Sequence, residues 1–308
     1  MILQLDTVTK DYIWGGTRLR EEFGKIGGKR LAESWELSVH PDGMCRVSGG
    51  EFHGMTLREF VEKFPESTGK NSLGNIPVLV KLIDAKENLS LQVHPDNDYA
   101  RQFEGDNGKT EAWYIVDCEE NASIIYGFKE NLTKEEFRRA IAENTLHEKV
   151  NTIAVKKGDV FLIRAGMLHA ICKGCLIAEI QQSSNVTYRV YDYGRKDAQG
   201  NTRPLHVEKA LEVSDLTRAA DAVEPTQTVV EGGVFTEVSS CSYFTVTKLE
   251  ADGTVAIDNP DSFIAVLITD GEGTIDGEKF VQYDTFFIPA NSDPVELNGK
   301  FQALLSEV

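Results

Sequence analysis

The sequence lacks the features that mark membrane and secreted proteins. No apolar stretch approaches the roughly 20 residues that a membrane helix needs. The first residues, MILQLDTVTKDYIWGG, show no basic start, no apolar run of signal length and no small-residue cleavage site. The five cysteines are an odd number, which does not suggest a framework of disulfides. We therefore expect a soluble, cytoplasmic protein.

Positive charge is scarce, above all near the C-terminus. The formal net charge is −17, and residues 221–308 hold 16 acidic residues against three lysines, which gives −13 there and leaves −4 for residues 1–220. Nucleic acids and anionic membranes need positive charge to meet phosphate, so neither is an expected partner. A small phosphorylated ligand needs only a local group of lysines or arginines. All six histidines lie at or before residue 206, so we expect the chemistry in that part of the chain.

Short strand-like runs dominate what the sequence does contain. They are rich in β-branched and aromatic residues and are separated by glycine, asparagine and aspartate, which predicts an all-β sandwich or barrel. The clearest runs are 76–84, 89–94, 112–117, 123–128, 159–164, 168–172, 175–181, 244–250 and 263–270. With 308 residues, 41% of them hydrophobic, the chain can form one large domain or two ordinary ones.

Helices are expected to be few and short. Segments 56–64 and 133–141 each begin with a threonine followed three residues later by a glutamate, the spacing of a capping box. A third helix is predicted after Pro204, through LHVEKALEV. The polar stretch 214–230 lacks clear periodicity, and we interpret it as a linker.

A short internal repeat predicts two related β units, residues 1–215 and 231–308. GDVFLIRAGMLHAI, which begins at residue 158, can be laid over YDTFFIPANSDPVEL, which begins at residue 283. Asp159 then falls on Asp284, while His169 falls on Pro294. The second copy has therefore lost the one residue that could hold a metal, and a structural role is expected for it.

The stretch NLSLQVHPDN, residues 88–97, carries the first polar pattern that suggests chemistry. Because side chains alternate along a strand, Ser90, Gln92 and His94 share one face, and three apolar residues share the other. A surface strand with its polar side in water is the simpler interpretation of this stretch alone. That interpretation weakens because related patterns recur further along the chain.

Two later strands add residues of the same chemical kind. Lys109 and Glu111 lie at i and i+2 at the start of one strand, and His169 follows RAGML on another. Two imidazoles, a carboxylate and an amide oxygen are a suitable set of ligands for Zn²⁺ or another divalent metal of the first transition row. The spacing alone does not establish that these strands meet.

The motif CKGC, residues 172–175, offers a competing metal or redox site. A Cys-x-x-Cys can be a redox pair or half of a zinc site. Here, however, the two middle residues suggest a two-residue hairpin turn, in which Cys172 faces Cys175. In that register both cysteines lie on the face opposite His169. We therefore expect two reduced cysteines that flank a turn.

The stretch NVTYRVYDYGR, residues 185–195, contributes fixed positive charge. Arg189 and Arg195 lie on an alternating, tyrosine-rich segment. Arginine donates from a rigid fork that suits phosphate or carboxylate oxygens. An edge strand whose arginines pair with nearby acids would explain the pattern equally well.

Taken in order along the chain, these motifs resemble one known family. GDVFLIRAGMLH resembles the second cupin signature, with Arg164 where proline is usual. The first signature normally has His-x-His with a glutamate shortly after it, whereas here Gln92 precedes His94 and Glu111 follows 17 residues later. This variant, with SLQVHPDN, KTEAWY and YRVYDYGR, resembles the type I mannose-6-phosphate isomerases of the short bacterial kind.

The resemblance covers residues 10 to about 215 and implies a fold. It includes two blocks near the N-terminus, DYIWGG and AESWELSVHPDG. The implied architecture is a cupin jelly-roll barrel in residues 1–215 that holds one zinc and carries short helical insertions. A smaller, degenerate and acidic cupin-like β-domain without metal ligands is expected in residues 231–308. Within the N-terminal blocks, Trp14, Glu33 and Trp35 are expected to have structural roles.

The resemblance also implies a role for each matching site residue. The matching metal ligands are His94, Glu111, His169 and Gln92. Arg189 matches the catalytic arginine, and Lys109 matches a lysine beside the metal that is a candidate for proton transfer. The positions expected to hold the substrate phosphate are Ser90, Lys81 and Arg195. The implied cofactor is one Zn²⁺ per chain, and the implied partner is a small phosphosugar.

The implied reaction interconverts mannose 6-phosphate and fructose 6-phosphate through an enediol. Negative charge builds on the carbonyl oxygen, which a Lewis-acid metal and fixed cations would stabilise. A lysine serves as the base only in its neutral form, which a neighbouring cation favours. Two alternatives remain, an iron or manganese oxygenase and a catalytically silent sugar-phosphate-binding relative. The sequence leaves open the physiological direction and the oligomeric state.

Overall fold

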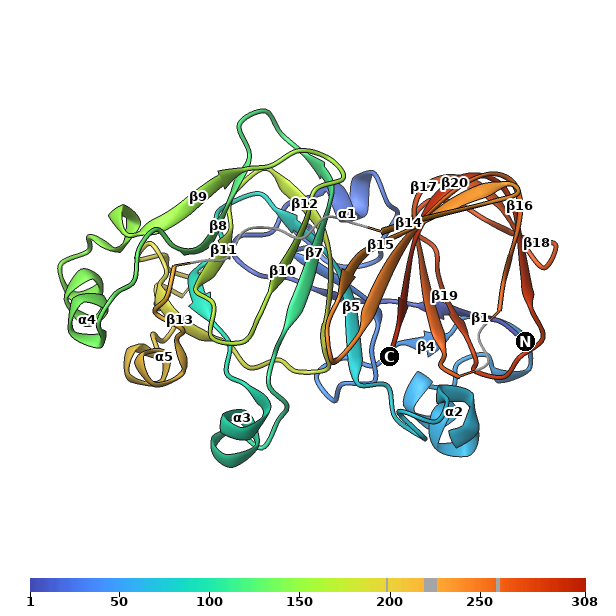
Figure 1. The fold of residues 1–308 in the computed structure, drawn as a ribbon, viewed down its shortest axis with the longest axis horizontal. Helices are drawn as coiled ribbons and strands as arrows, with labels where there is room; N and C mark the ends of the chain where they lie inside the picture. The colour runs from blue at the N-terminus through green and yellow to red at the C-terminus, as the bar shows by residue number, and fades with distance from the viewer. Residues whose placement is uncertain (198, 219–225, 259–260) are drawn as a thin grey trace.

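The structure is a computed structural model that describes residues 1–197, 199–218, 226–258 and 261–308. Figure 1 shows two β-rich lobes side by side, with both ends of the chain in the lobe that contains the C-terminal strands. Strands make up most of the regular structure, so the predicted all-β class with few short helices is confirmed. Among the described residues, no helix is both long and apolar enough to cross a bilayer.

Two antiparallel sheets build the first lobe. The first is a six-stranded sheet in the order β10 (Val160–Ile163), β7 (Glu111–Cys118), β12 (Cys175–Gln182), β5 (Val78–Ala85), β3 (Glu33–Leu37) and β2 (Val8–Lys10). The second is a five-stranded sheet in the order β13 (Tyr188–Tyr191), β6 (Leu91–Val93), β11 (His169–Ile171), β8 (Ser123–Phe128) and β9 (Val150–Ala154).

A third antiparallel sheet builds the second lobe. In the described part of the chain its order is β14 (Thr226–Val230), β15 (Gly233–Ser240), β16 (Thr245–Ile257), β20 (Val295–Glu307), β17 (Ile264–Ile275), β19 (Thr285–Ile288), β1 (Leu3–Asp6) and β4 (Arg46–Val47), with β18 (Glu278–Phe280) paired to β17. Strand β1 pairs with β19, so the start of the chain completes a sheet formed mainly by its end. The predicted domain limits, 1–215 and 231–308, remain a prediction.

The helices are short, and the three predicted ones are present. The α-helices of the described residues are α1 (Arg18–Glu21), α2 (Leu57–Lys63), α3 (Asn97–Phe103), α4 (Lys134–Ala142) and α5 (Val207–Val213), and 3-10 turns cover Gly50–Phe52, Pro65–Thr68 and Leu146–Glu148. Helices α2 and α4 begin with the predicted capping boxes, in which Thr56 and Thr133 each exchange hydrogen bonds with a glutamate three residues later. Helices α1 and α3 were not predicted.

The six-stranded sheet is buried on both faces, and its two faces pack against the other two sheets. On one face, Ile83, Ile115 and Ile177 share a core with Ile124 and Ile171 of the five-stranded sheet. Alternate residues of the same strands, such as Val80 and Leu82, share a second core with apolar residues of the third sheet. A site between the first two sheets therefore lies on a six-stranded sheet whose opposite face is packed against the third sheet.

The predicted internal repeat reappears as a shared local structure. Both copies form a turn followed by a strand, β10 in the first and β19 in the second. The aspartate side chain accepts a hydrogen bond from the backbone N–H three residues earlier, at 3.0 Å for Asp159 and 2.9 Å for Asp284. The left-handed residue after the strand is Gly166 (φ 86°) in the first copy and Asn291 (φ 55°) in the second, two residue types that tolerate this conformation.

Two predictions about connecting segments need correction. Strands β11 and β12 do not form a hairpin across CKGC, because β11 pairs with β6 and β8 while β12 pairs with β5 and β7. The turn between Cys172 and Cys175 therefore carries the chain from one sheet to the other, and both thiols are free, as predicted. Of the predicted linker 214–230, residues 219–225 lie outside the described part, and residues 226–230 form strand β14.

Candidate active site

Cross-strand register brings the candidate residues into two rows, one on each sheet of the first lobe. In the five-stranded sheet, Arg189 on β13 is the partner of Gln92 on β6, which is in turn the partner of His169 on β11. In the six-stranded sheet, Lys81 on β5 is the partner of Glu179 on β12. Because the two sheets face each other across a shared core, both rows point into the space between them.

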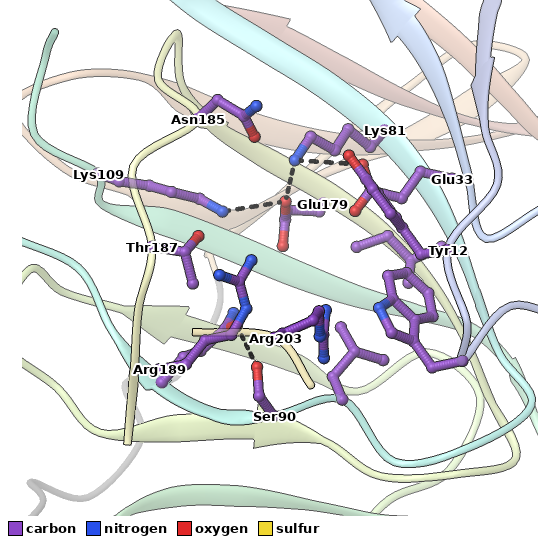
Figure 2. Close-up of a pocket in the computed structure, with 14 residues that line it drawn as sticks. Tyr12, Glu33, Lys81, Ser90, Lys109, Glu179, Asn185, Thr187, Arg189 and Arg203 are labelled. Atoms are coloured by element: carbon purple, nitrogen blue, oxygen red, sulfur yellow. Dashed lines mark hydrogen bonds and ion pairs between the residues drawn. The ribbon is translucent and has the colours of Figure 1, made fainter. Parts of the chain in front are cut away.

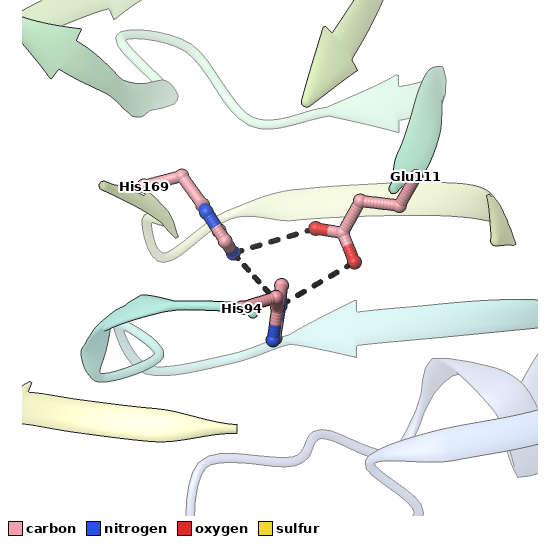
Figure 3. A group of neighbouring side chains, drawn as sticks. All are labelled: His94, Glu111 and His169. Carbon is pink, nitrogen blue, oxygen red and sulfur yellow. Dashed lines mark hydrogen bonds and ion pairs between the residues drawn. The ribbon is translucent and has the colours of Figure 1, made fainter. Parts of the chain in front are cut away.

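His94, Glu111 and His169 form a buried cluster in which their ligand atoms lie within 4.8 Å of one another (Figure 3). The two Nε2 atoms lie 3.1 Å apart. They lie 3.6 Å (His94) and 3.4 Å (His169) from the two carboxylate oxygens of Glu111. Two imidazole nitrogens and a carboxylate that converge in this way are a common donor set for zinc.

Backbone carbonyls fix the orientation of both imidazoles. Nδ1 of His94 lies 2.8 Å from the carbonyl oxygen of Val186, and Nδ1 of His169 lies 2.8 Å from that of Met167. A proton on each Nδ1 leaves the Nε2 lone pairs directed at the cluster, which is the arrangement seen around metal-binding histidines. Oε1 of Glu111 is buried and accepts no hydrogen bond within the described residues. These residues therefore fit a bound metal ion.

Burial controls the protonation of the three side chains. It lowers the pKa of His169 to about 4 and that of His94 well below the usual range, with Lys109 adding to the effect on His94. Burial and the nearby Glu179 raise the pKa of Glu111 to about 7, against the opposing effect of Lys109. Near neutral pH both imidazoles are therefore uncharged, which is the form that binds a metal.

Gln92 extends the cluster toward the adjacent cavity. Its side-chain amide nitrogen lies 3.3 Å from Nε2 of His169, and its oxygen accepts a hydrogen bond from Ser90 at 3.2 Å. A half-turn of the amide exchanges its nitrogen and oxygen and directs the oxygen at the cluster. Gln92 can therefore supply a fourth ligand.

A polar cavity of about 140 Å³ opens beside the cluster (Figure 2). Ser90 and Gln92 line it, together with Tyr12 and Trp14. The charged residues that line it are Glu33, Lys81, Lys109, Glu179, Arg189 and Arg203. Lys109 joins the cavity to the cluster, because its Nζ lies 2.8 Å from Oε2 of Glu111. A ligand in this cavity would contact charged groups of both signs and a candidate metal site.

Glu179 holds the two lysines of the cavity in place. Its Oε1 lies 3.2 Å from Nζ of Lys81 and 3.5 Å from Nζ of Lys109, and its Oε2 accepts a hydrogen bond from Trp113 at 3.0 Å. Burial opposes the charge of this carboxylate, but Lys109 and Lys81 lower the pKa of Glu179 to about 2. Lys81 also lies 3.7 Å from Glu33. The network is buried and internally paired.

Replacing Glu179 with glutamine should therefore destabilise the protein. The change removes the charge between two buried lysines and keeps the shape of the side chain, and loss of one partner in a buried ion pair costs about 3 kcal/mol or more. Urea unfolding gives the free energy of unfolding. The control is Glu250→Gln, which removes a 2.7 Å surface pair with Lys248 and should cost less than about 1 kcal/mol. Equal effects of the two variants would contradict the structural role of Glu179.

The structure brings together all but one of the predicted site residues. The residues that lie in the cluster or line the cavity are Lys81, Ser90, Gln92, His94, Lys109, Glu111, His169 and Arg189. Arg195 is not among the residues that line the cavity. Its guanidinium donates to Asp192 and to the carbonyl oxygen of Asn88.

The prediction missed several residues that line the cavity. Glu179 could have been noticed, because it is the only charged residue in the apolar run CLIAEIQ. Arg203 lies in a loop before Pro204, where no strand pattern marks it. The resemblance implies structural roles for Trp14 and Glu33, but both line the cavity. Trp35 is fully buried and donates a hydrogen bond to Glu33 at 2.7 Å.

Two family models match separate parts of the chain. Residues 2–154 match the catalytic domain of type I phosphomannose isomerase, and residues 235–308 match the cupin domain of mannose-6-phosphate isomerase. Together they account for strands of both lobes.

Relatives with assigned names match most or all of the chain. A mannose-6-phosphate isomerase of Streptococcus mutans is 42% identical over 85% of this chain and 83% of its own length. The probable mannose-6-phosphate isomerase GmuF of Bacillus subtilis is 38% identical over 99% of this chain and 98% of its own length. The crystal structure of the mannose 6-phosphate isomerase from Bacillus subtilis is 35% identical, covers 100% of this chain and 99% of that chain, and superposes with a TM-score of 0.95.

Proposed function

The chain belongs to the type I phosphomannose isomerase family and is a mannose-6-phosphate isomerase, and we propose that it works with one Zn²⁺ per chain and through an enediol intermediate. The observation that carries the proposal is the buried His94–Glu111–His169 cluster, with both imidazoles oriented by backbone carbonyls, beside a cavity lined with lysine and arginine. We also propose a cytoplasmic location, in keeping with the sequence-based expectation.

His94, Glu111 and His169 would hold the zinc, with Gln92 as a fourth ligand. Bound zinc acts as a Lewis acid that polarises a carbonyl or hydroxyl oxygen of the sugar. Glu111, once it is a ligand, is not free to accept a proton from the substrate. The proton transfer therefore requires another group that reaches the cavity.

Lys109 is the proposed group for moving the proton between C1 and C2 of the sugar. Its Nζ lies 2.8 Å from Oε2 of Glu111 and lines the cavity, so it reaches both the ligands and a bound substrate. Arg189, the strand partner of Gln92, would stabilise the negative charge that builds on the oxygen of the enediolate. Ser90, Lys81 and Arg195 remain the resemblance-based candidates for binding the phosphate.

Loss of the Arg189 side chain should lower kcat but leave metal binding unchanged. Its Nε is buried and has no hydrogen-bond partner within the described residues, which suits a group whose partner is the substrate. Replacing Arg189 with alanine should lower kcat by about 100-fold, the scale found for removal of one stabilising donor from an active site. Zinc content, measured by mass spectrometry, should stay at the wild-type value. An unchanged kcat would remove Arg189 from the mechanism.

An isotope experiment tests the enediol route. Mannose 6-phosphate deuterated at C2 should react more slowly than the unlabelled sugar, and the fructose 6-phosphate should have lost deuterium to solvent. Complete retention of the label at C1 would overturn the enediol and indicate a hydride shift instead. Oxygen uptake by the protein would favour an oxygenase, and absence of any conversion would favour a silent sugar-phosphate-binding relative.

A further inference from the structure

An unusual group of arginines lies on one side of the cavity. Arg189 and Arg203 both line it, and Figure 2 shows them near Ser90, away from Lys81 and Glu33. Both side chains line the same cavity, and burial, followed by the positive charge of Arg203, lowers the pKa of Arg189. Two cations that line one cavity favour an anion as the ligand, because an opposite charge stabilises their charged forms.

Asp192 supplies only part of that negative charge. This buried carboxylate accepts two hydrogen bonds from Arg203, from Nε at 2.7 Å and from Nη2 at 2.6 Å, and a third from Arg195. Two guanidinium groups therefore share this carboxylate. Counted with Arg189, which lines the cavity beside Arg203, the three arginines and Asp192 have a net charge of +2. A phosphate monoester carries about −1.5 to −2 near neutral pH, so its charge matches this excess.

Asp192 holds the guanidinium group of Arg203 so that one of its nitrogen atoms stays free. Asp192 occupies Nε and Nη2, while Nη1 donates no hydrogen bond within the described residues. The side chain is 24% exposed, compared with 5% for Asp192, so the arginine reaches the cavity while its anchor stays buried. An arginine fixed in this way loses little conformational entropy when it binds an anion.

The opposite side of the cavity has the opposite balance of charge. There, Lys81 and Lys109 face three carboxylates, those of Glu33, Glu179 and Glu111. Because Lys81 is already paired with two of them, it has little free charge to offer a phosphate dianion. The two ends of a sugar phosphate therefore meet different environments in this cavity.

We propose that Arg203, positioned by Asp192, binds the phosphate of the substrate and thereby orients C1 and C2 toward the His94–Glu111–His169 cluster. This inference rests on the proposed function, because it takes a hexose 6-phosphate as the ligand. It differs from the resemblance-based expectation that Arg195 is the arginine that binds the phosphate. Arg195 is instead the second cation that keeps Asp192 ionised and in place.

The test compares Arg203→Ala with Arg195→Ala. Each variant leaves Asp192 with one arginine partner, so neither creates a buried unpaired carboxylate. Arg203→Ala should raise KM for mannose 6-phosphate by about 10- to 100-fold, the scale for loss of a charged hydrogen bond, with a smaller change in kcat. Inhibition by inorganic phosphate should weaken in parallel, whereas the binding of unphosphorylated mannose should weaken less than the binding of mannose 6-phosphate. Arg203→Lys, which keeps the charge but not the fork, should give an intermediate KM.

Two outcomes would overturn the inference. One is a larger rise of KM in Arg195→Ala than in Arg203→Ala, and the other is an equal loss for mannose and mannose 6-phosphate in Arg203→Ala. Calorimetric binding of inorganic phosphate and of mannose 6-phosphate to both variants gives the same comparison without turnover. If wild-type protein binds mannose 6-phosphate but does not convert it, the proposed function fails while the role of Arg203 is still decided by binding.

Discussion

Replacing His169 with alanine is expected to abolish zinc binding and to lower kcat/KM for mannose 6-phosphate by about 1,000-fold or more, since a catalytic metal supplies several kcal/mol of transition-state stabilisation. His169 is fully buried, and its Nε2 lies 3.4 Å from Glu111 and 3.1 Å from Nε2 of His94. Removal of His169 leaves one imidazole, one carboxylate and the neutral amide oxygen of Gln92, which is a weaker donor set for zinc than two imidazoles and a carboxylate. Mass-spectrometric metal analysis and steady-state kinetics on the same preparation measure both effects.

The matched control for this variant is His147→Ala. The side chain of His147 is 75% exposed and does not belong to the cluster, so zinc content and kcat/KM should match wild type. Circular dichroism should show that both variants are folded. A His169→Ala protein that keeps its zinc and its activity would contradict the assignment of the cluster as the metal site.

Replacing Lys109 with alanine is expected to lower kcat by about 1,000-fold, within the range that general acid–base groups contribute, while zinc content stays at the wild-type value. The fold should tolerate the change, because both carboxylates that contact Lys109 have other partners. Glu179 keeps its ion pair with Lys81, and Glu111 would bind the metal. The measurement is kcat at saturating mannose 6-phosphate, alongside metal analysis.

The outcome of the Lys109 experiment separates a chemical role from an electrostatic one. A Lys109→Arg variant keeps the positive charge but transfers protons poorly, so it should remain as inactive as alanine. Lys156→Ala, at a side chain that is 83% exposed, is the control for loss of a lysine and should retain full activity. Wild-type turnover in Lys109→Ala would remove this residue from the mechanism.

Local patterns predicted most strands and helices, because those elements depend on neighbouring residues. The run 175–181 became β12 and the run 123–128 became β8, and the capping boxes of α2 and α4 formed as their threonine–glutamate spacing indicates. The sequence pattern favours a linker where strand β14 forms, because TQTVV is short and lies next to a polar stretch. Its pairing with β15 depends on residues that lie beyond that local sequence.

The prediction of a hairpin at CKGC is wrong for a different physical reason. A two-residue turn between two apolar runs is a valid hairpin pattern, but each run found a better partner in a different sheet. Residue 169 is paired with Gln92 and Tyr126, and neither pairing can be read from the two runs alone. Register between distant strands is set by the burial of whole faces, which a single sequence does not reveal.

The candidate site could be predicted where residues lie on strands and poorly where they lie in loops. Alternation placed Gln92 and His94 on one face, and the family resemblance supplied the matching Glu111 and His169. Arg203 follows no periodic pattern, and only the structure shows that it shares Asp192 with Arg195. Arg203 lines the cavity and Arg195 does not. This difference depends on the path of the loop that contains Arg203, which the sequence pattern does not predict.

The most direct test of the central claim is to measure metal content and isomerase activity together. Protein as purified is analysed by mass spectrometry for metals and assayed for conversion of mannose 6-phosphate to fructose 6-phosphate, before and after chelation and after zinc is restored. We expect one zinc per chain, activity that disappears with the metal and activity that returns with zinc. Full activity in metal-free protein would contradict the role of the His94–Glu111–His169 cluster.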